Sequence, residues 1–198
     1  EVSVIENGYN DKVYFPLSGT EKEKLKTQLD LKPDSVNLLF SGSGWERKGL
    51  PAAINISGII LDKYPNSHFW IAGKGSAKKY RKIIKKKKLN NKITFLGSVK
   101  NISKWYQACD LMILPTRYDP FSNSCLEALA CGCPVITSEK NGAKDIILRS
   151  NGGLSLTTIV KLPSKSETAP VVASNTTFAP GTGILSSVTT VPVTVVCA

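Results

Sequence analysis

Residues 111–137 read LMILPTRYDPFSNSCLEALACGCPVIT. Apolar runs at 111–114 and 134–137 predict two buried strands, and the segment 124–130 between them predicts a helix that ends at Gly132. A strand, a helix and a second strand in this order form the unit from which parallel sheets are built. The stretch therefore predicts an α/β fold.

The same alternation of apolar and amphipathic segments runs through the preceding part of the chain. We expect strands at 36–40, 68–72 and 93–96, and helices at 48–64, from the lysine-rich run to Asn90, and from Asn101 or Ser103 to Ala108. Such a pattern predicts a parallel sheet with helices on both faces, joined by right-handed crossovers. Sheets of this kind bind ligands beyond the carboxyl ends of their strands, where the glycine-rich and polar turns of this chain lie.

Basic residues dominate the charge, because 26 Lys and Arg stand against 15 Asp and Glu, for a net charge of +11. Residues 78–88 carry eight positive charges and no negative one. A solvated helix face with Tyr80, Ile83 and Ile84 turned inward is the simplest interpretation, and peripheral contact with an anionic membrane is the alternative. Nucleic acid is disfavoured as a partner, because no aromatic residues alternate with the lysines as a single-strand groove requires.

Cysteine content and hydropathy bear on the compartment. The five cysteines are an odd number without a regular framework, which indicates a reducing compartment and buried, unpaired thiols. A single His and no second cysteine pair beside Cys131 and Cys133 argue against zinc, so we expect no metal. No apolar run reaches the roughly 18 residues of a transmembrane helix. We expect a cytoplasmic protein, or one peripheral to the inner face of the membrane.

The two ends of the chain differ from the alternating region. Residues 1–17 contain a short apolar run and a linker-like segment, Tyr14-Phe15-Pro16, and the chain starts at Glu1 without a leader, as a fragment or mature piece would. Residues 155–198 lose the alternation and form a Ser-, Thr- and Val-rich tail, whose end predicts a weak strand or disorder. The predicted domain is therefore 18–154.

The turn after the first strand has the properties of a phosphate-binding loop. Gly42, Ser43 and Gly44 allow close approach of the backbone, and Arg47 and Lys48 stand at the start of the next helix. Arg can hold phosphate oxygens in a bidentate manner, and Lys adds a point charge. The dinucleotide fingerprint and the Walker pattern are both absent, so this loop alone is a weak signal.

A second candidate site is the turn before the last predicted helix. Ser122, Asn123 and Ser124 can present backbone N–H groups at the helix start, where the helix dipole favours an anion. Asp119 before the helix and Glu127 one turn inside it would supply carboxylates for the hydroxyl groups of a sugar phosphate. The alternative is structural: Asp119 or Ser122 caps the helix and Glu127 faces water.

Together these motifs resemble the carboxyl-terminal domain of family 4 retaining glycosyltransferases, which have the GT-B fold. The matching stretches are 108–116, 119–137, 141–143, 146–147, 71–75, 95–97 and the loop 42–49, which has the form used by lipopolysaccharide core glucosyltransferases. Asp119 and Glu127 stand at the two positions of that family's Glu-x7-Glu motif. The match covers about residues 2–154 and implies a Rossmann-like half of a GT-B fold, with residues 1–17 as an interdomain segment.

The resemblance implies a donor site for a UDP- or GDP-sugar, most of all one like UDP-glucose, that works without a metal or cofactor. Arg47 and Lys48 would neutralise the donor diphosphate as it leaves, and Asp119 would hold hydroxyls of the donor sugar. Glu127 would hold the ribose, and the backbone near Val99 would read the base. Further donor contacts are expected from Gly42, Ser43, Gly44, Phe121, Ser122, Asn123 and Ser124.

Two substitutions depart from the family pattern, because Asp119 replaces Glu and Ser122 replaces a residue that is usually Gly. The family's amino-terminal domain, which carries most of the site for a glycan or lipid-linked acceptor, has no counterpart here. We therefore expect weak donor binding and little transfer from this chain alone, and a truncated or non-catalytic nucleotide-sugar-binding module is the alternative. A dehydrogenase domain is disfavoured, because the glycine fingerprint and an acidic residue after the second strand are missing.

Overall fold

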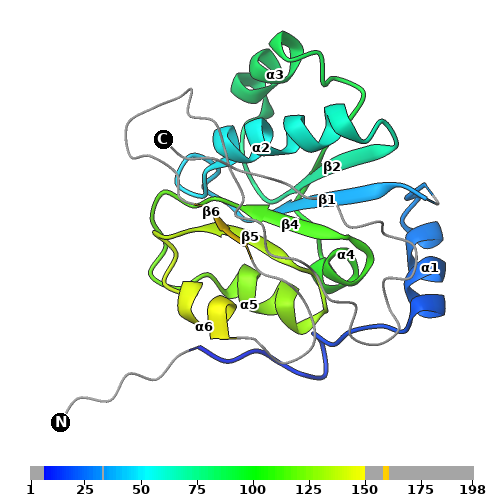
Figure 1. Ribbon diagram of the computed structural model, residues 1–198, viewed down its shortest axis with the longest axis vertical. Helices are drawn as coiled ribbons and strands as arrows, with labels where there is room; N and C mark the ends of the chain where they lie inside the picture. Colours follow the sequence, from blue (N-terminus) through cyan, green and yellow to red (C-terminus); the bar gives the residue numbers. More distant parts are fainter. Residues whose placement is uncertain (1–6, 33, 150–157, 161–198) are drawn as a thin grey trace.

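The computed structural model describes residues 7–32, 34–149 and 158–160, which form one parallel sheet with helices around it (Figure 1). The strands lie in the order β3-β2-β1-β4-β5-β6, and every neighbouring pair is parallel. Their bounds are Val36–Ser41 (β1), Ser67–Ala72 (β2), Ile93–Gly97 (β3), Leu111–Leu114 (β4), Val135–Ser138 (β5) and Thr158–Val160 (β6). The predicted Rossmann-like α/β fold is confirmed.

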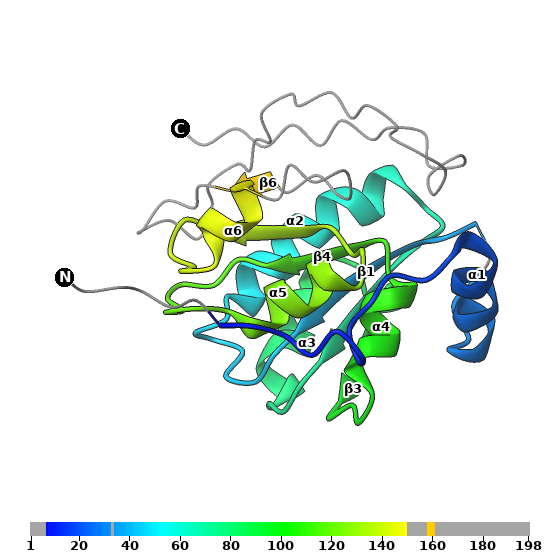
Figure 2. The ribbon, with the colours of Figure 1, turned by 90° about the horizontal axis from the view of Figure 1, so that it is seen from below.

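The helices cover both faces of the sheet. They are Gly19–Gln28 (α1), Leu50–Lys63 (α2), Ala77–Lys86 (α3), Ile102–Ala108 (α4), Asn123–Ala130 (α5) and Lys144–Arg149 (α6). Helix α2 contacts β1, β2 and β4, whereas α4 and α5 contact each other and β1, β4 and β5. Figure 2 shows α4 and α5 in front of the sheet and α2 behind it.

The strand order places one crevice at the carboxyl edge of the sheet. The chain first builds outward from β1 to β3, then returns through α4 to β4 on the other side of β1. The register pairs Leu38 with Leu111 and Leu39 with Met112, so the loops after β1 and β4 leave the sheet side by side. A parallel sheet binds its ligand where the strand order reverses in this way.

The central strands are apolar because they are covered on both faces. Leu38, Leu39 and Phe40 of β1 are fully buried, and so are Met112 and Ile113 of β4. Such strands lack the alternation of a half-exposed sheet and read as continuous apolar runs, which is why the sequence located them to within one residue at each end.

Three elements were not expected from the sequence. In α1 only Leu25 is buried, so apolar periodicity gives no signal there, although Ser18 and Glu21 form a capping box that is readable in the sequence. Helix α6 has only six residues, and β6 has only three and pairs with β5. Strand β6 lies beyond the domain limit predicted at 154; that limit stays a prediction. The strands expected within 1–6 and near the end of the chain lie outside the described residues.

Candidate functional site

The loop after β1 is held in place from both sides by close backbone contacts. At Gly73 in the loop after β2, a Cβ atom would lie 2.0 Å from the carbonyl oxygen of Gly42. At Gly49, where φ is +78°, a Cβ would lie 1.9 Å from the carbonyl oxygen of Pro115 in the loop after β4. Only glycine fits at either place. The three loops therefore meet as one layer at the carboxyl edge of the sheet.

Lys48 and Asp119 form a buried ion pair in this layer. The Nζ atom of Lys48 donates a hydrogen bond to Oδ2 of Asp119 and lies 3.4 Å from Oγ of Ser122. Both residues are almost completely shielded from solvent, with 9% of Lys48 and 6% of Asp119 exposed. A buried charge needs a partner and further hydrogen bonds, and this pair brings the loop after β1 to the start of α5.

Arg47 lies beside this pair but keeps its guanidinium half exposed. One of its terminal nitrogens is 3.7 Å from Oδ2 of Asp119 and donates a 3.0 Å hydrogen bond to the carbonyl of Tyr118. The structure thus brings together Arg47, Lys48 and Asp119, the three residues that the sequence proposes as catalytic. Their catalytic role itself stays a prediction.

The start of α5 is held by Asn141 from the loop after β5. Its Oδ1 atom accepts hydrogen bonds from the backbone N–H groups of Ser122, at 3.3 Å, and Ala143, at 3.1 Å. Its Nδ2 atom donates to Oγ1 of Thr137 at 2.8 Å. Asn141 is fully buried, and the sequence alone assigned it no role.

The residues before α5 do not cap the helix through their side chains, which was one part of the structural alternative. Ser122 occupies the position before the first helical residue, but its side chain makes no capping hydrogen bond. Asp119 pairs with Lys48 instead of capping the helix. Both polar side chains are buried at the start of α5, and their contact with a ligand stays a prediction.

Glu127 lies in a half-buried environment instead of facing water. Burial raises the pKa of its carboxyl group, and hydrogen bonds from the hydroxyls of Tyr14 and Tyr106 offset only part of that effect. The hydroxyl of Tyr106 is also 2.9 Å from Oγ of Ser41 at the end of β1. Glu127 thus belongs to a polar chain that runs from the end of β1 to Tyr14, and its predicted contact with a ribose is an expectation that this environment does not test.

The segment before α1 is anchored on α4 and α5. Nδ2 of Asn7 donates a 2.9 Å hydrogen bond to Oδ1 of Asn123, so this predicted donor contact is already engaged at the surface. Nε2 of Gln107 donates a 2.9 Å hydrogen bond to the carbonyl oxygen of Phe15. The segment around Tyr14-Phe15-Pro16 is thus anchored on the domain, and its role as an interdomain linker stays a prediction.

The remaining predicted donor contacts are spread along the same edge. Oγ of Ser43 accepts a 3.2 Å hydrogen bond from the backbone N–H of Lys74, and Gly44 adopts φ of +70°. Phe121 and Val99 are partly buried and pack against the core, and Val99 lies in the loop between β3 and α4. Ser124 at the first turn of α5 is partly buried.

Helix α3 presents its basic residues to solvent. Tyr80 and Ile84 are buried and Ile83 is partly buried, whereas the Lys and Arg residues at 78–88 are exposed. The predicted solvated helix face is therefore confirmed. None of the helices in the described part of the chain has the length and apolar character to cross a bilayer.

The described cysteines are unpaired and buried, as predicted. They are Cys109, Cys125, Cys131 and Cys133. Burial raises the pKa of the Cys131 and Cys133 thiols to about 12, so neither is a thiolate at neutral pH. Within the described ranges, no group of three or more His, Cys, Asp or Glu side chains could hold a metal ion.

Comparison with known protein families identifies the family of this chain. The family model described as "Glycosyl transferases group 1" matches residues 35–166. The chain belongs to this family. The match includes the loop after β1, the loop after β4 and α5, so this glycosyltransferase domain carries its polar loop layer within the matched region.

Individual relatives support the family and show how much of them is present. The domain is 31% identical over 158 residues to an uncharacterised glycosyltransferase of Methanocaldococcus jannaschii, covering 78% of this chain and 40% of the relative. It is 26% identical over 151 residues to the lipopolysaccharide core biosynthesis mannosyltransferase LpsB of Rhizobium meliloti, covering 73% of this chain and 42% of that protein. The chain thus spans less than half the length of these relatives.

Solved structures share the fold. WaaG, a glycosyltransferase involved in lipopolysaccharide biosynthesis, superimposes with a TM-score of 0.71 at 22% identity, over 82% of this chain and 43% of WaaG. HepE of Anabaena in complex with UDP-glucose gives a TM-score of 0.64 at 25% identity, over 78% of this chain and 43% of HepE. The Rossmann-like half of a GT-B glycosyltransferase is therefore the architecture of this domain.

Proposed function

We propose that this domain binds the nucleotide diphosphate of a sugar donor, a UDP-hexose in the first place, at the loop after β1 and the start of α5. In the complete enzyme the hexose is transferred with retention to a glycan or lipid-linked acceptor. The observation that carries the proposal is the convergence of Arg47, Lys48 and Asp119 at the start of α5. A solved relative with the same fold, HepE, was crystallised with UDP-glucose.

The geometry suits a diphosphate leaving group. Arg47 is half exposed and can swing onto phosphate oxygens, while Lys48 supplies a fixed charge from within the protein. Cations placed in advance where negative charge develops stabilise that charge without reorganisation. The N–H of Ser122 is engaged by Asn141, so the backbone N–H groups of Asn123 and Ser124 present the positive end of the α5 dipole. Metal-free charge neutralisation is the function we assign to these groups.

The carboxylates of Asp119 and Glu127 would bind different parts of the donor, the sugar and the ribose. Asp119 uses Oδ2 for Lys48, and its Oδ1 atom hydrogen-bonds to no described residue, so it remains for a hydroxyl of the sugar. Glu127 would accept the ribose hydroxyls, and the backbone near Val99 would contact the base. Protonation of Glu127 weakens its acceptor strength, so donor affinity is expected to fall on acidification.

Calorimetric titration tests donor binding directly. UDP, UDP-glucose, GDP-mannose and NAD are titrated into the full chain, and we expect UDP-glucose to bind and NAD not to bind. Arg47→Ala removes a charge-assisted contact without breaking the buried Lys48–Asp119 pair, so affinity should fall about tenfold or more. The matched control is Lys86→Ala on the exposed face of α3, which should leave affinity unchanged.

Two outcomes count against the proposal. Binding of no nucleotide sugar would contradict it, and equal affinity in wild type and Arg47→Ala would show that the phosphate loop is misassigned. Donor binding without transfer fits the domain by itself, since it spans less than half of its relatives. A non-catalytic binding module is favoured only if a complete version also binds the donor and transfers nothing.

We also propose that the basic face of α3 touches an anionic membrane. The Lys and Arg residues at 78–88 are all exposed, and each Lys or Arg near an anionic leaflet contributes about 1 kcal/mol. Sedimentation with phosphatidylcholine vesicles that contain phosphatidylglycerol should retain the chain, and the variant Lys82→Glu/Lys85→Glu/Lys86→Glu should stay in solution. Equal retention by pure phosphatidylcholine would contradict the electrostatic mechanism.

A further inference from the structure

The segment 7–17, which precedes α1, follows α5 from the start of the helix to its end. Figure 2 shows this segment, in blue, running past α5 toward α1. Three pairs of neighbouring residues lie in the same order along both elements: Asn7 with Asn123, Tyr14 with Glu127, and Pro16 with Gly132. The segment is therefore packed along the same helix that carries the candidate donor contacts.

Glu127 receives hydrogen bonds from two tyrosine hydroxyls that come from different elements. Tyr14 belongs to the segment 7–17, and Tyr106 lies on α4. The two rings are neighbours, with centroids 6.3 Å apart and planes inclined by 47°. Burial raises the pKa of both hydroxyls, so both are protonated at neutral pH and can donate to the carboxylate.

Neutral donors, not cations, thus fix the Glu127 carboxylate. Among the described residues Glu127 makes no ion pair. An ionised carboxylate has about four lone-pair directions, so two tyrosine hydroxyls leave about two of them for the hydroxyls of a ligand. Hydrogen bonds to the ionised form also favour it over the carboxylic acid, which preserves an acceptor for those hydroxyls.

The two tyrosines differ in how firmly they are held. Tyr106 is fully buried, and its hydroxyl is 2.9 Å from Oγ of Ser41, the residue before the glycine-rich loop. Because Tyr106 donates its proton to Glu127, Ser41 donates to Tyr106. Tyr14 is only partly buried and stands outside the helices and strands. The core therefore fixes one hydrogen bond to Glu127, and the position of the segment 7–17 determines the other.

We propose that Tyr14 and Tyr106 are positioning residues of the donor site, which hold the Glu127 carboxylate in the orientation that accepts the ribose hydroxyls of the nucleotide. The proposal rests on the proposed donor-binding function and extends the site to a segment that precedes the first helix. Displacement of this segment from α5 would release one side of the carboxylate. It would weaken the ribose contact and leave the diphosphate contact at Arg47 unchanged.

A pair of ligands isolates the ribose contact. UDP and 2′,3′-dideoxy-UDP share the base and the diphosphate, but the second lacks both ribose hydroxyls. In calorimetric titrations of the full chain, we expect wild type to prefer UDP about tenfold or more. Tyr14→Phe keeps the ring and removes the hydroxyl, so it should reduce this preference about threefold or more by weakening UDP alone. Tyr106→Phe should act in the same direction.

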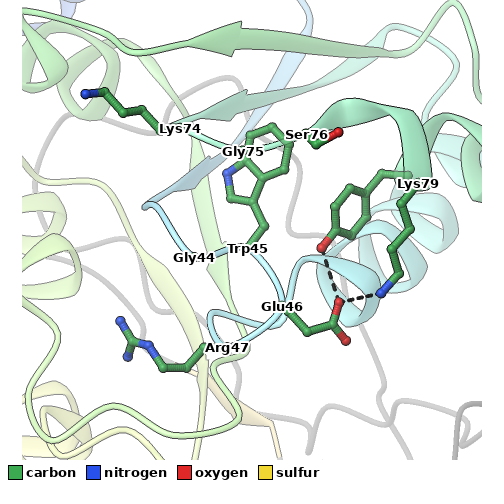
Figure 3. A pocket seen from close by; sticks show the side chains of 9 residues that line it. Gly44, Trp45, Glu46, Arg47, Lys74, Gly75, Ser76 and Lys79 are labelled. Atoms are coloured by element: carbon green, nitrogen blue, oxygen red, sulfur yellow. Dashed lines mark hydrogen bonds and ion pairs between the residues drawn. The ribbon is translucent and has the colours of Figure 1, made fainter.

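The matched control is Tyr80→Phe, because Tyr80 also hydrogen-bonds to a glutamate through its hydroxyl. That hydroxyl is 3.3 Å from Oε2 of Glu46, in the lining of the pocket between the loop after β1 and α3, where Lys79 binds the same oxygen (Figure 3). Tyr80→Phe should leave both affinities unchanged. Adding Tyr14→Phe to Glu127→Ala should cause no further loss of preference, since Tyr14 acts through Glu127.

The outcomes separate this proposal from donor binding itself. Equal weakening of UDP and 2′,3′-dideoxy-UDP by Tyr14→Phe would assign Tyr14 a structural role and overturn its positioning role. Equal affinity of wild type for the two ligands would also overturn the proposal, because Glu127 would then not bind the ribose, while donor binding would stand. If wild type binds neither ligand, the donor site is misassigned and the positioning role fails with it.

Discussion

Helices α5 and α3 both begin just after a strand of the same sheet, yet their starts are built in opposite ways. At α5, Lys48, Asp119 and Asn141 are buried and are bonded to protein partners. At α3, Lys74 is exposed, and the indole N–H of the nearby Trp45 has no hydrogen-bond partner among the described residues. The first start is held by buried polar contacts within the protein, and the second is surrounded by exposed charged side chains.

The two regions differ in whether their charges are buried and paired or exposed to solvent. A buried ion pair is expensive to break, so the α5 side should govern stability as well as donor binding. Exposed cations are screened by water and salt, so the α3 side should affect association and leave folding nearly unchanged. Substitutions in the two regions can break or sharpen this contrast.

The largest effect is expected from Lys48→Met. It leaves the Asp119 carboxylate buried without its partner, and such a loss costs about 3–5 kcal/mol of the free energy of unfolding. Urea denaturation measures the change, and Lys86→Met on α3 is the control, expected within about 0.5 kcal/mol of wild type. Adding Asp119→Asn to Lys48→Met should restore part of the loss; no restoration would mean that the loss does not come from the unpaired Asp119 carboxylate.

A smaller loss is expected from Asn141→Ala. This change removes the acceptor for the backbone N–H groups of Ser122 and Ala143 and leaves them buried, at about 1–3 kcal/mol. Asn90→Ala, at an exposed position, gives the reference value. Thermal unfolding followed by circular dichroism distinguishes the two variants, and an Asn141→Ala protein as stable as the reference would show that water replaces the amide.

The pH dependence of stability should report on Glu127. Its pKa is raised in the folded protein because burial disfavours the carboxylate, so the folded state holds the proton to higher pH than the unfolded state. The contribution of this group to stability is therefore greatest below its ordinary pKa and is lost as the pH rises through the raised pKa. Glu127→Gln should be more stable than wild type at neutral pH and should equal it at low pH.

Asp62→Asn, which alters an exposed carboxylate, provides the comparison for that measurement. Denaturant titrations at a series of pH values yield both profiles. If Glu127→Gln loses stability at neutral pH, the hydrogen bonds from Tyr14 and Tyr106 to the ionised carboxylate outweigh its burial.

The smallest effect is expected at Glu46 on the open side. Its ion pairs with Lys79 and Arg117 join side chains that are each more than half exposed. Such pairs contribute about 0–1 kcal/mol, so Glu46→Gln should hardly change the unfolding midpoint. A loss as large as that of Lys48→Met would remove the contrast between the two regions.

The buried region around the start of α5 was also predicted better from the sequence than the open region around α3. Continuous apolar runs located β1 and β4, and the spacing of Asp119 and Glu127 marked the loop and helix that carry the candidate site. The loop 42–49 was a weak signal by itself and was recognised because it resembles the corresponding loop of the family. In each case burial or close backbone approach restricts which residue types are possible, so the sequence indicates where these strands and loops lie.

Other features depend on contacts that no local pattern contains. Asn141 holds the start of α5 across 19 residues of sequence, and Tyr14 reaches Glu127 from the far end of the chain. Helix α1 has no apolar face and strand β6 is short, so apolar periodicity does not predict them. Their formation depends on contacts with α4 and with β5, respectively. The burial of the Trp45 indole depends on Gly75, Tyr80 and Phe95, which are distant from it in sequence.

The labelling rate of one buried thiol can measure how often the loop layer opens. Cys125 lies in α5 directly beneath the site, is fully buried, and receives a 3.3 Å contact from Nδ2 of Asn141. Burial raises its pKa, so alkylation must wait for a local opening that exposes and ionises the thiol. The labelling rate of this one residue, measured by peptide mass spectrometry, thus reports how often α5 opens. A bound ligand that keeps the helix closed would lower that rate in proportion to the time it is bound.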